Sequence, residues 1–219
     1  MASKYLDSPH CLLSDSPPSR EPGTVLLETE RLILRRPLAS DAPTLAAIGS
    51  YAEVAQNMSD RFRYPYTVED AESYLAMVLP KQDGDDDPKS YYPKACLFFL
   101  KPNSPDNPTP EPVMIGSMGC STGEDIHHIQ WTLGYFLTPS AWGKGYATEA
   151  IGGFVHWAFA TWPKLHRIEA ETFSTNMASA KMLRRIGFTQ EGIRRGCMIK
   201  KGVIQDALVF GRLRTDKQR

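Results

Sequence analysis

One segment near the middle of the chain constrains the fold most. An apolar run, Gly134–Leu137, leads through a turn into Trp142–Ala150, which carries glycines at 143 and 145. Glycine lets the backbone adopt left-handed conformations and approach a ligand closely. The free N–H groups and the positive dipole end of a helix's first turn favour an anion. The pattern therefore predicts a strand, a turn and a helix start that hold a phosphate, most simply that of a diphosphate-bearing cofactor.

Composition excludes several classes of protein. A chain of 219 residues with 42 % apolar content suits one soluble domain with a real core. Lys+Arg and Asp+Glu number 25 each, which disfavours nucleic acid and anionic membranes as partners. No apolar run reaches the roughly 18 residues of a membrane span. We therefore expect a cytoplasmic protein, with the nucleus as a second option, that acts as a monomer or homodimer.

The cysteines and the acidic run give no sign of a metal. The four cysteines show no CxxC spacing, which argues against a zinc site and a disulfide framework and favours free thiols in a reducing compartment. They are Cys11, Cys96, Cys120 and Cys197. The acidic run 83–87 lacks a spaced partner, so we interpret it as a solvated loop and predict no metal.

Periodicity and turn signals predict a mixed sheet with helices on both faces. Residues 1–23 are expected to form a flexible tail, with order beginning near Thr24. The first half is expected to hold a strand Val25–Arg36, a helix capped by Ser40, an irregular segment 51–66, and a helix from Thr67 to about Leu79 with Asp70 completing a capping box. Strands 95–101 and 113–121 should follow around a proline-rich loop, and then a strand 126–137 and a helix that Pro163 ends. The last part should hold a strand 166–173, a helix from Asn176 to Gly187, and strands 188–199 and 203–213.

Three motifs in this order resemble the GNAT acyltransferase superfamily, and more closely its Rim-type branch, which is named for acetylating ribosomal-protein N-termini. They are Glu28–Arg35, Trp142–Ala150, and Asn176–Ser179 followed by Gly187-Phe188. Asp206 and Phe210 match the family's closing Asp-x-x-x-aromatic strand. The resemblance implies an N-acetyltransferase domain over 24–215, of the α/β (α+β mixed) class, with a mostly antiparallel sheet of about seven strands. It also implies acetyl-CoA as donor and an amine as acceptor.

The resemblance assigns the donor site mainly to backbone groups. The pantetheine would lie beside a splayed strand, Tyr135–Leu137, and a backbone N–H there would meet the thioester carbonyl. Such donors contribute about 2.7–4 kcal/mol in other oxyanion holes. The implied cofactor-binding residues are Tyr135, Phe136, Leu137, Trp142, Gly143, Lys144, Gly145, Tyr146, Ala147, Thr148, Asn176 and Ser179.

The proton donor departs from the family pattern. The superfamily often places a tyrosine seven residues after the asparagine of the last helix, but that position is Leu183 here. Ser179 is the predicted replacement, and simple helix-start chemistry is the alternative role for it.

The base is also unusual. Relatives often carry a glutamate two residues before the Gly-Tyr pair, where this chain has Thr132. Strand alternation would place His128 on the same face as Gln130 and Thr132, so His128, or Glu171 on the neighbouring strand, is a candidate base acting through water.

The acceptor is predicted less sharply than the donor. At pH 7 an α-amine is neutral in roughly 10–20 % of molecules and a lysine amine in about 0.04 %, a difference of about 3.5 kcal/mol. A site without an obvious strong base therefore favours a protein or peptide N-terminus. The expected acceptor wall is Arg61, Arg63, Tyr64 and Tyr66, for which surface packing is the alternative explanation.

Other functions stay open from the sequence. Within enzymes, a polyamine or antibiotic-like amine is an alternative acceptor. Outside them, a non-catalytic acyl-CoA-binding or sensor domain would keep the cofactor site and lose the acid and base. A Rossmann dinucleotide site is disfavoured because Thr148 stands where its third glycine or alanine would be, and the Gly145-Tyr146 pair breaks a P-loop.

Overall fold

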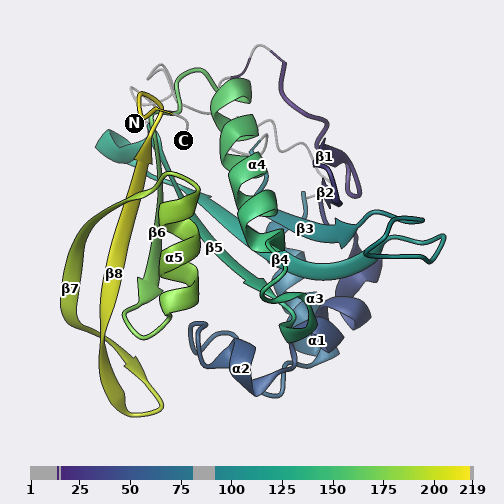
Figure 1. The fold of residues 1–219 in the computed structure, drawn as a ribbon, viewed down its shortest axis with the longest axis horizontal. Coiled ribbons are helices and arrows are strands. Elements are labelled where there is room, and N and C mark those ends of the chain that lie inside the picture. Colours follow the sequence, from purple (N-terminus) through teal and green to yellow (C-terminus); the bar gives the residue numbers. More distant parts are fainter. Residues whose placement is uncertain (1–13, 15, 81–91, 218–219) are drawn as a thin grey trace, which may run out of the picture.

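A central sheet of eight strands runs through the molecule in the order β1-β2-β3-β4-β5-β6-β8-β7 (Figure 1). The structure, a computed structural model, describes residues 14, 16–80 and 92–217. All neighbouring strands pair antiparallel except β5 and β6, which are parallel. The strands are β1 (Val25–Glu28), β2 (Leu32–Arg35), β3 (Ala95–Leu100), β4 (Val113–Thr122), β5 (Gln130–Leu137), β6 (Arg167–Phe173), β7 (Thr189–Lys200) and β8 (Val203–Leu213).

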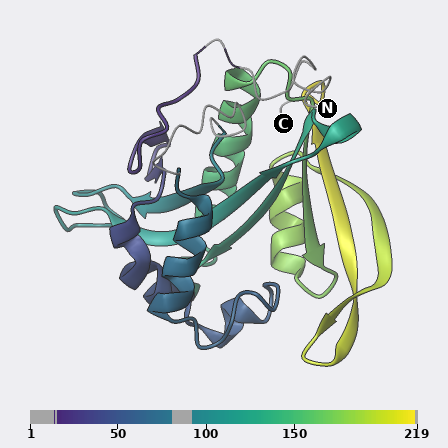
Figure 2. The same ribbon diagram turned by 180° about the vertical axis from the view of Figure 1, so that it is seen from behind.

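Helices cover both faces of this sheet, as predicted. The helices α4 (Tyr146–Thr161) and α5 (Met177–Arg185) lie on one face, and α1 (Ala42–Gly49) and α3 (Val68–Val78) lie on the other (Figures 1 and 2). A short helix, α2 (Ala52–Ala55), follows α1. The mixed, mostly antiparallel architecture expected from the sequence is therefore confirmed.

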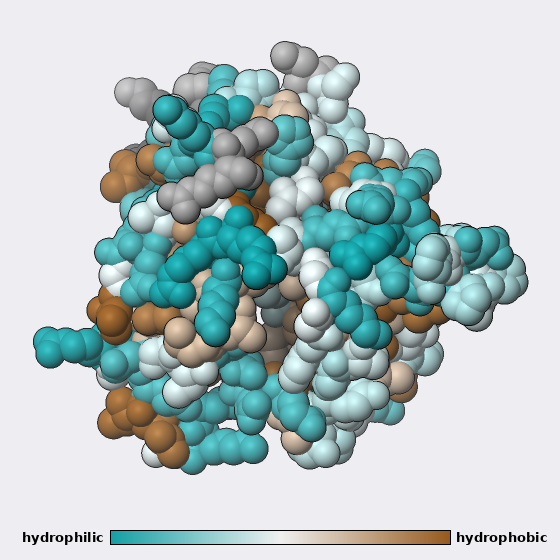
Figure 3. All heavy atoms as spheres, in the orientation of Figure 1, coloured by the Kyte–Doolittle hydropathy of each residue, from teal (hydrophilic) through white to brown (hydrophobic). Residues whose placement is uncertain are grey.

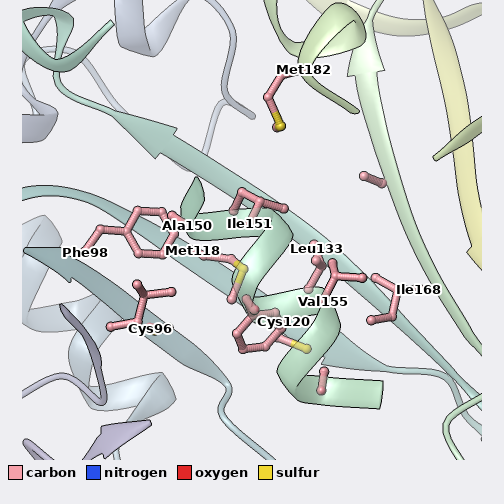
Figure 4. Packing of buried hydrophobic residues seen from close by; sticks show 14 of the residues in the cluster. Cys96, Phe98, Met118, Cys120, Leu133, Ala150, Ile151, Val155, Ile168 and Met182 are labelled. Atoms are coloured by element: carbon pink, nitrogen blue, oxygen red, sulfur yellow. The ribbon is translucent and has the colours of Figure 1, made fainter. Parts of the chain in front are cut away.

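Each face has its own hydrophobic core. Under α4, the strand residues Phe98, Met118 and Leu133 pack against Ile151 and Val155 of the helix (Figure 4). All five side chains are less than 4 % exposed. Burial of this kind stabilises by about 25 cal/mol per Å² of apolar surface. This packing fixes α4, and with it the glycine turn at its start, against the middle of the sheet.

The first strand differs from its prediction. The single strand Val25–Arg36 is wrong, because the chain turns at Thr29–Arg31 and returns as β2. This division accounts for eight strands where about seven were expected. The turn is held from far along the chain, since Thr29 Oγ1 donates to Glu149 Oε1 at 2.6 Å.

Helix starts follow the predicted chemistry in two of three cases. Thr67 and Asp70 form the predicted capping box of α3, with reciprocal bonds of 3.2 Å. Asn176 caps α5 as predicted. The predicted cap at Ser40 is wrong: Ser40 lies in a 3₁₀ turn, Ala39–Asp41, and α1 begins after Asp41. Asp41 instead holds the turn, because its carboxylate accepts from the Leu38 N–H at 2.6 Å.

The strand predicted from 126 to 137 begins only at Gln130, because Asp125–His127 form a 3₁₀ turn. Part of the predicted tail, the acidic run 83–87 and Cys11 lie outside the described residues. Just before Thr24 the chain is already attached, since Arg36 Nε donates to the Ser19 carbonyl at 2.8 Å. In the part of the chain that the structure describes, no helix is both long and apolar enough to cross a membrane.

Candidate active site

The site begins where two parallel strands separate. β5 and β6 pair only from Gln130↔Arg167 to Leu133↔Ala170, whereas β5 stays paired with β4 as far as Leu137. From Gly134 onward, the edge of β5 that faces β6 therefore has no partner strand. A cavity of about 860 Å³ opens at this point, visible as the hollow near the centre of Figure 3. Free backbone groups along its wall are suited to bind the amides of an extended ligand.

The glycine turn closes one end of the cavity with unpaired N–H groups. Gly143 and Gly145 have φ of 74° and 83°, the left-handed region that only glycine adopts without strain. Gly145 is the N-cap of α4, so Tyr146, Ala147 and Thr148 are its first-turn residues. Within the described chain, no hydrogen bond is made by the N–H groups of 143–148. A glycine turn with free N–H groups, the arrangement that was predicted to hold an anion, is thus found at this end of the cavity.

An ion pair on the outer side holds this turn in place. The Glu149 carboxylate, in the first turn of α4, lies 2.7 Å from Arg31 Nη2 and accepts from the Arg31 backbone N–H at 2.8 Å. Arg31 Nη1 in turn donates to the Lys144 carbonyl at 3.1 Å. Burial alone would raise the pKa of Glu149, but hydrogen bonds from Thr29 and Arg31 outweigh it, so its pKa is lowered. The sequence showed these residues only as parts of motifs and gave no sign that they meet.

Trp142 is fixed to the end of the splayed strand. Its Nε1 donates to the Leu137 carbonyl at 2.8 Å, and the side chain stays 46 % exposed. The indole thus satisfies one carbonyl of the open edge and forms part of the cavity wall.

The start of α5 forms the opposite wall. Asn176 Oδ1 accepts from the Ser179 backbone N–H at 3.2 Å, which satisfies one of the free N–H groups of the helix start. The Ser179 hydroxyl lies 2.8 Å from the hydroxyl of Tyr135 on β5. Burial raises the pKa of Tyr135 to about 12. Ser179 therefore sits beside the splay with its side chain already positioned by a neighbour.

The other end of the cavity is assembled from distant segments. One wall comes from residues 53–60, in and after α2, and the other from the ends of β6 and β7. Lys200 Nζ joins the two walls by a 2.8 Å ion pair with Asp60, and the Lys200 side chain is only 9 % exposed. Glu171 also lines this end and pairs with Arg194 Nη1 at 2.8 Å.

The residues predicted to bind the acetyl-CoA donor lie together in the structure, with one exception. All of them line the cavity except Lys144, whose carbonyl accepts from Arg31 instead. Among the candidate proton-transfer residues, Ser179 and Glu171 line the cavity. His128 does not: it precedes β5, so it does not share the strand face of Thr132, and its Nδ1 lies 2.7 Å from the Asp125 carbonyl oxygen.

The predicted acceptor residues lie outside the cavity. Tyr66 is buried and stacks on Phe62 with ring centroids 4.2 Å apart, and burial raises its pKa to about 12. Arg61, Arg63 and Tyr64 are exposed. The segment just before them, which includes Glu53 and ends at Asp60, lines the cavity instead. No sequence signal marked that segment, because its place depends on an ion pair with β7.

Nothing in the described ranges resembles a metal site: no group of three or more His, Cys, Asp or Glu side chains is arranged to hold an ion.

Comparison with known proteins identifies the family. Residues 31–189 match the acetyltransferase (GNAT) domain family. An uncharacterized N-acetyltransferase of Bacillus subtilis (strain 168), YoaA, is 31 % identical over 189 residues, which span 84 % of this chain and 94 % of the relative. The chain therefore belongs to the GNAT acetyltransferase family, and the predicted class of enzyme, an N-acetyltransferase, is confirmed.

Two solved structures share the fold. The ribosomal-protein-S5-alanine acetyltransferase from Vibrio fischeri has a TM-score of 0.66 and 24 % identity, covering 87 % of this chain and 97 % of that one. RimL, a ribosomal L7/L12 alpha-N-protein acetyltransferase solved in complex with coenzyme A, has a TM-score of 0.68 and 20 % identity, covering 86 % and 97 %.

Proposed function

We propose that this enzyme transfers an acetyl group from acetyl-CoA to the α-amino group of a protein or peptide N-terminus. One observation carries the proposal: an open strand edge beside Gly134–Leu137 leads from a glycine turn with free N–H groups to a second, carboxylate-lined end of the same cavity. The first end suits a diphosphate and its pantetheine arm. The second suits a cation.

The acceptor end favours an amine by its charge. Glu53, Asp60 and Glu171 line it, and the basic side chains that line the cavity are Lys181, Arg185 and Lys200. Two of these carboxylates are already paired, Asp60 with Lys200 and Glu171 with Arg194. Among the described residues Glu53 makes no ion pair, so its carboxylate is available to attract an ammonium group.

An α-amine is the acceptor we favour within that class. Its pKa near 7.7–8.0 leaves roughly 10–20 % neutral at pH 7, so little work is required of a base. The names of the two solved neighbours, which describe acetylation of ribosomal proteins, agree with this choice. We also infer a cytoplasmic location, with which the spacing of the four cysteines in the sequence agrees.

Three groups of the chain would act in the reaction. A backbone N–H of the open β5 edge would stabilise the oxyanion that forms when the amine attacks the thioester carbonyl. Ser179 would give a proton to the leaving sulfur, and Glu171 would take one from the amine, directly or through water.

The donor site is tested by the thermal shift that acetyl-CoA produces. Gly143→Asp should abolish most of the shift, because a carboxylate in the turn repels the diphosphate. Gly202→Asp is the matched control: its φ is 78° against 74° at Gly143, and in both places an added Cβ meets no atom within 4 Å. NAD should produce no comparable shift. An undiminished shift in the Gly143 variant would refute the assignment of the turn.

The acceptor is tested with a panel of amines at fixed acetyl-CoA. Peptides with free N-termini, the same peptides with blocked N-termini and an internal lysine, polyamines and aminoglycosides are compared by release of free thiol and by mass spectrometry. Acetylation confined to free N-termini supports the proposal. Preference for a polyamine or aminoglycoside assigns a small-molecule acceptor instead, and donor binding without turnover on any amine assigns a sensor.

A further inference from the structure

Two hydroxyl groups meet at the point where β5 leaves β6. Tyr135 lies two residues after the last pair of these strands, and Ser179 is the third residue of α5. Their oxygens are 2.8 Å apart, and both residues line the cavity. Within the described chain this contact is the one hydrogen bond of the Tyr135 hydroxyl.

The chemistry of the two groups decides which of them donates. Either hydroxyl could donate across this contact. Because a phenol is a far stronger acid than an aliphatic alcohol, we assign the donor role to the Tyr135 O–H and the acceptor role to the Ser179 oxygen. A serine hydroxyl has a single hydrogen. Because the Ser179 oxygen accepts from Tyr135, the Ser179 hydrogen is available to a different acceptor in the cavity.

The phenol also keeps its hydrogen under assay conditions. Burial raises the pKa of Tyr135 to about 12, well above any ordinary assay pH. Tyr135 thus acts as a permanent donor to Ser179. Hydrogen bonds in a chain polarise one another, so this donation makes the Ser179 O–H a better donor in turn.

We propose that Tyr135 is a positioning residue that holds the Ser179 O–H toward the sulfur that leaves during acetyl transfer. The proposal rests on the proposed function. As the amine nitrogen bonds to the carbonyl carbon, the C–S bond breaks and its electron pair stays on sulfur. Glu171 takes the first proton of the ammonium group, and as sulfur takes a proton from Ser179, Ser179 regains the second amine proton through cavity water. One proton passes from nitrogen to sulfur, and both hydroxyls end unchanged.

The test is a double-mutant cycle on kcat and on the KM for acetyl-CoA. Ser179→Ala should lower kcat roughly 10²-fold. Tyr135→Phe should lower it about 10-fold while the KM changes less than about twofold. The double variant should be no slower than Ser179→Ala alone, because Tyr135 acts only through Ser179.

Tyr74→Phe is the matched control. Tyr74 is also a tyrosine whose hydroxyl bonds to a serine, Ser117, and whose pKa burial raises, but it does not line the cavity. This variant should keep the wild-type kcat. A wild-type kcat for Tyr135→Phe, or the same loss whether residue 179 is serine or alanine, would overturn the proposal.

A second reaction shows whether a negative result comes from a wrongly assigned acceptor or from a wrong role for Tyr135. The same variants are compared in the hydrolysis of acetyl-CoA without amine, where water attacks but the same sulfur leaves. Coupling of Tyr135 and Ser179 there supports the proposal even if the acceptor is misassigned. Independent losses, or hydrolysis no faster than without enzyme, overturn it.

Discussion

Replacing Glu149 by glutamine should loosen the glycine turn and lower stability by a predictable amount. The carboxylate accepts from Thr29 Oγ1 at 2.6 Å, from the Arg31 backbone N–H at 2.8 Å and from Arg31 Nε at 2.7 Å. Glutamine keeps the shape but loses the charge and turns an NH₂ group toward donors. Charge-assisted bonds contribute about 1.5–3 kcal/mol when buried. The Arg31 and Glu149 side chains are 33 % and 17 % exposed, so we expect a loss near the lower end, about 1.5–2 kcal/mol.

The assay is thermal unfolding at several pH values. For a domain of this size the expected loss corresponds to a decrease in Tm of about 3–8 °C at pH 7. Because the pKa of Glu149 is lowered from 4.5, its contribution is complete above that value and is lost as pH falls through the folded-state pKa. The difference in Tm between wild type and variant should therefore be largest at pH 7 and become smaller in acid.

Glu28→Gln is the control. Glu28 is also paired, with Lys101 Nζ at 3.0 Å, but its side chain is 56 % exposed, so its loss should change stability by less than about 0.5 kcal/mol. Two results contradict the reasoning: a Glu149→Gln Tm equal to that of wild type at pH 7, or a gap that persists undiminished in acid. The first would mean that the ion pair does not stabilise the turn, and the second that the charge is not the cause.

Two further changes test other parts of the site. Asn176→Ala should destabilise the protein by about 1 kcal/mol in chemical denaturation, because the Ser179 N–H loses its cap, and Asn176→Asp should retain most of the stability; equal losses would exclude a capping role. Glu171→Gln should lower turnover most near neutral pH and progressively less toward the amine's own pKa, whereas His128→Asn, outside the cavity, should follow the wild-type pH profile. A flat loss at every pH in Glu171→Gln would indicate packing, not proton transfer.

The local geometry of the proposed donor site could be predicted because it depends on neighbouring residues. Gly143 and Gly145 adopt positive φ, and Asn176 caps its own helix within three residues. Such features depend on residues adjacent in sequence, so spacing alone reveals them.

The break in the first strand could not be predicted in this way. Thr29–Arg31 contains none of the glycine, proline or asparagine that mark tight turns. The turn is held by Glu149, which is 120 residues away from Thr29. A strand pattern read from neighbouring residues continues through such a position, because the interaction that bends the chain is tertiary. The early start predicted for β5 failed in a similar way, since Asp125 takes φ of 50° and begins a 3₁₀ turn that alternation does not show.

The two ends of the cavity therefore differ in which substitutions they tolerate. The donor end is made of backbone groups whose positions depend on φ angles and on the core beneath α4, so most changes there disturb the fold. The proposed acceptor end is made of side chains from α2 and the residues that follow it, and from β6 and β7, and the Asp60–Lys200 pair, 140 residues apart in sequence, joins them. Asp60 is 72 % exposed, but its partner Lys200 is only 9 % exposed, so replacing Asp60 would leave a buried ammonium group without its partner. Under the proposed function we therefore expect that replacing a side chain at this end that makes no ion pair in the described part of the chain, such as Glu53, changes the choice of amine and leaves the backbone edge of β5 unchanged.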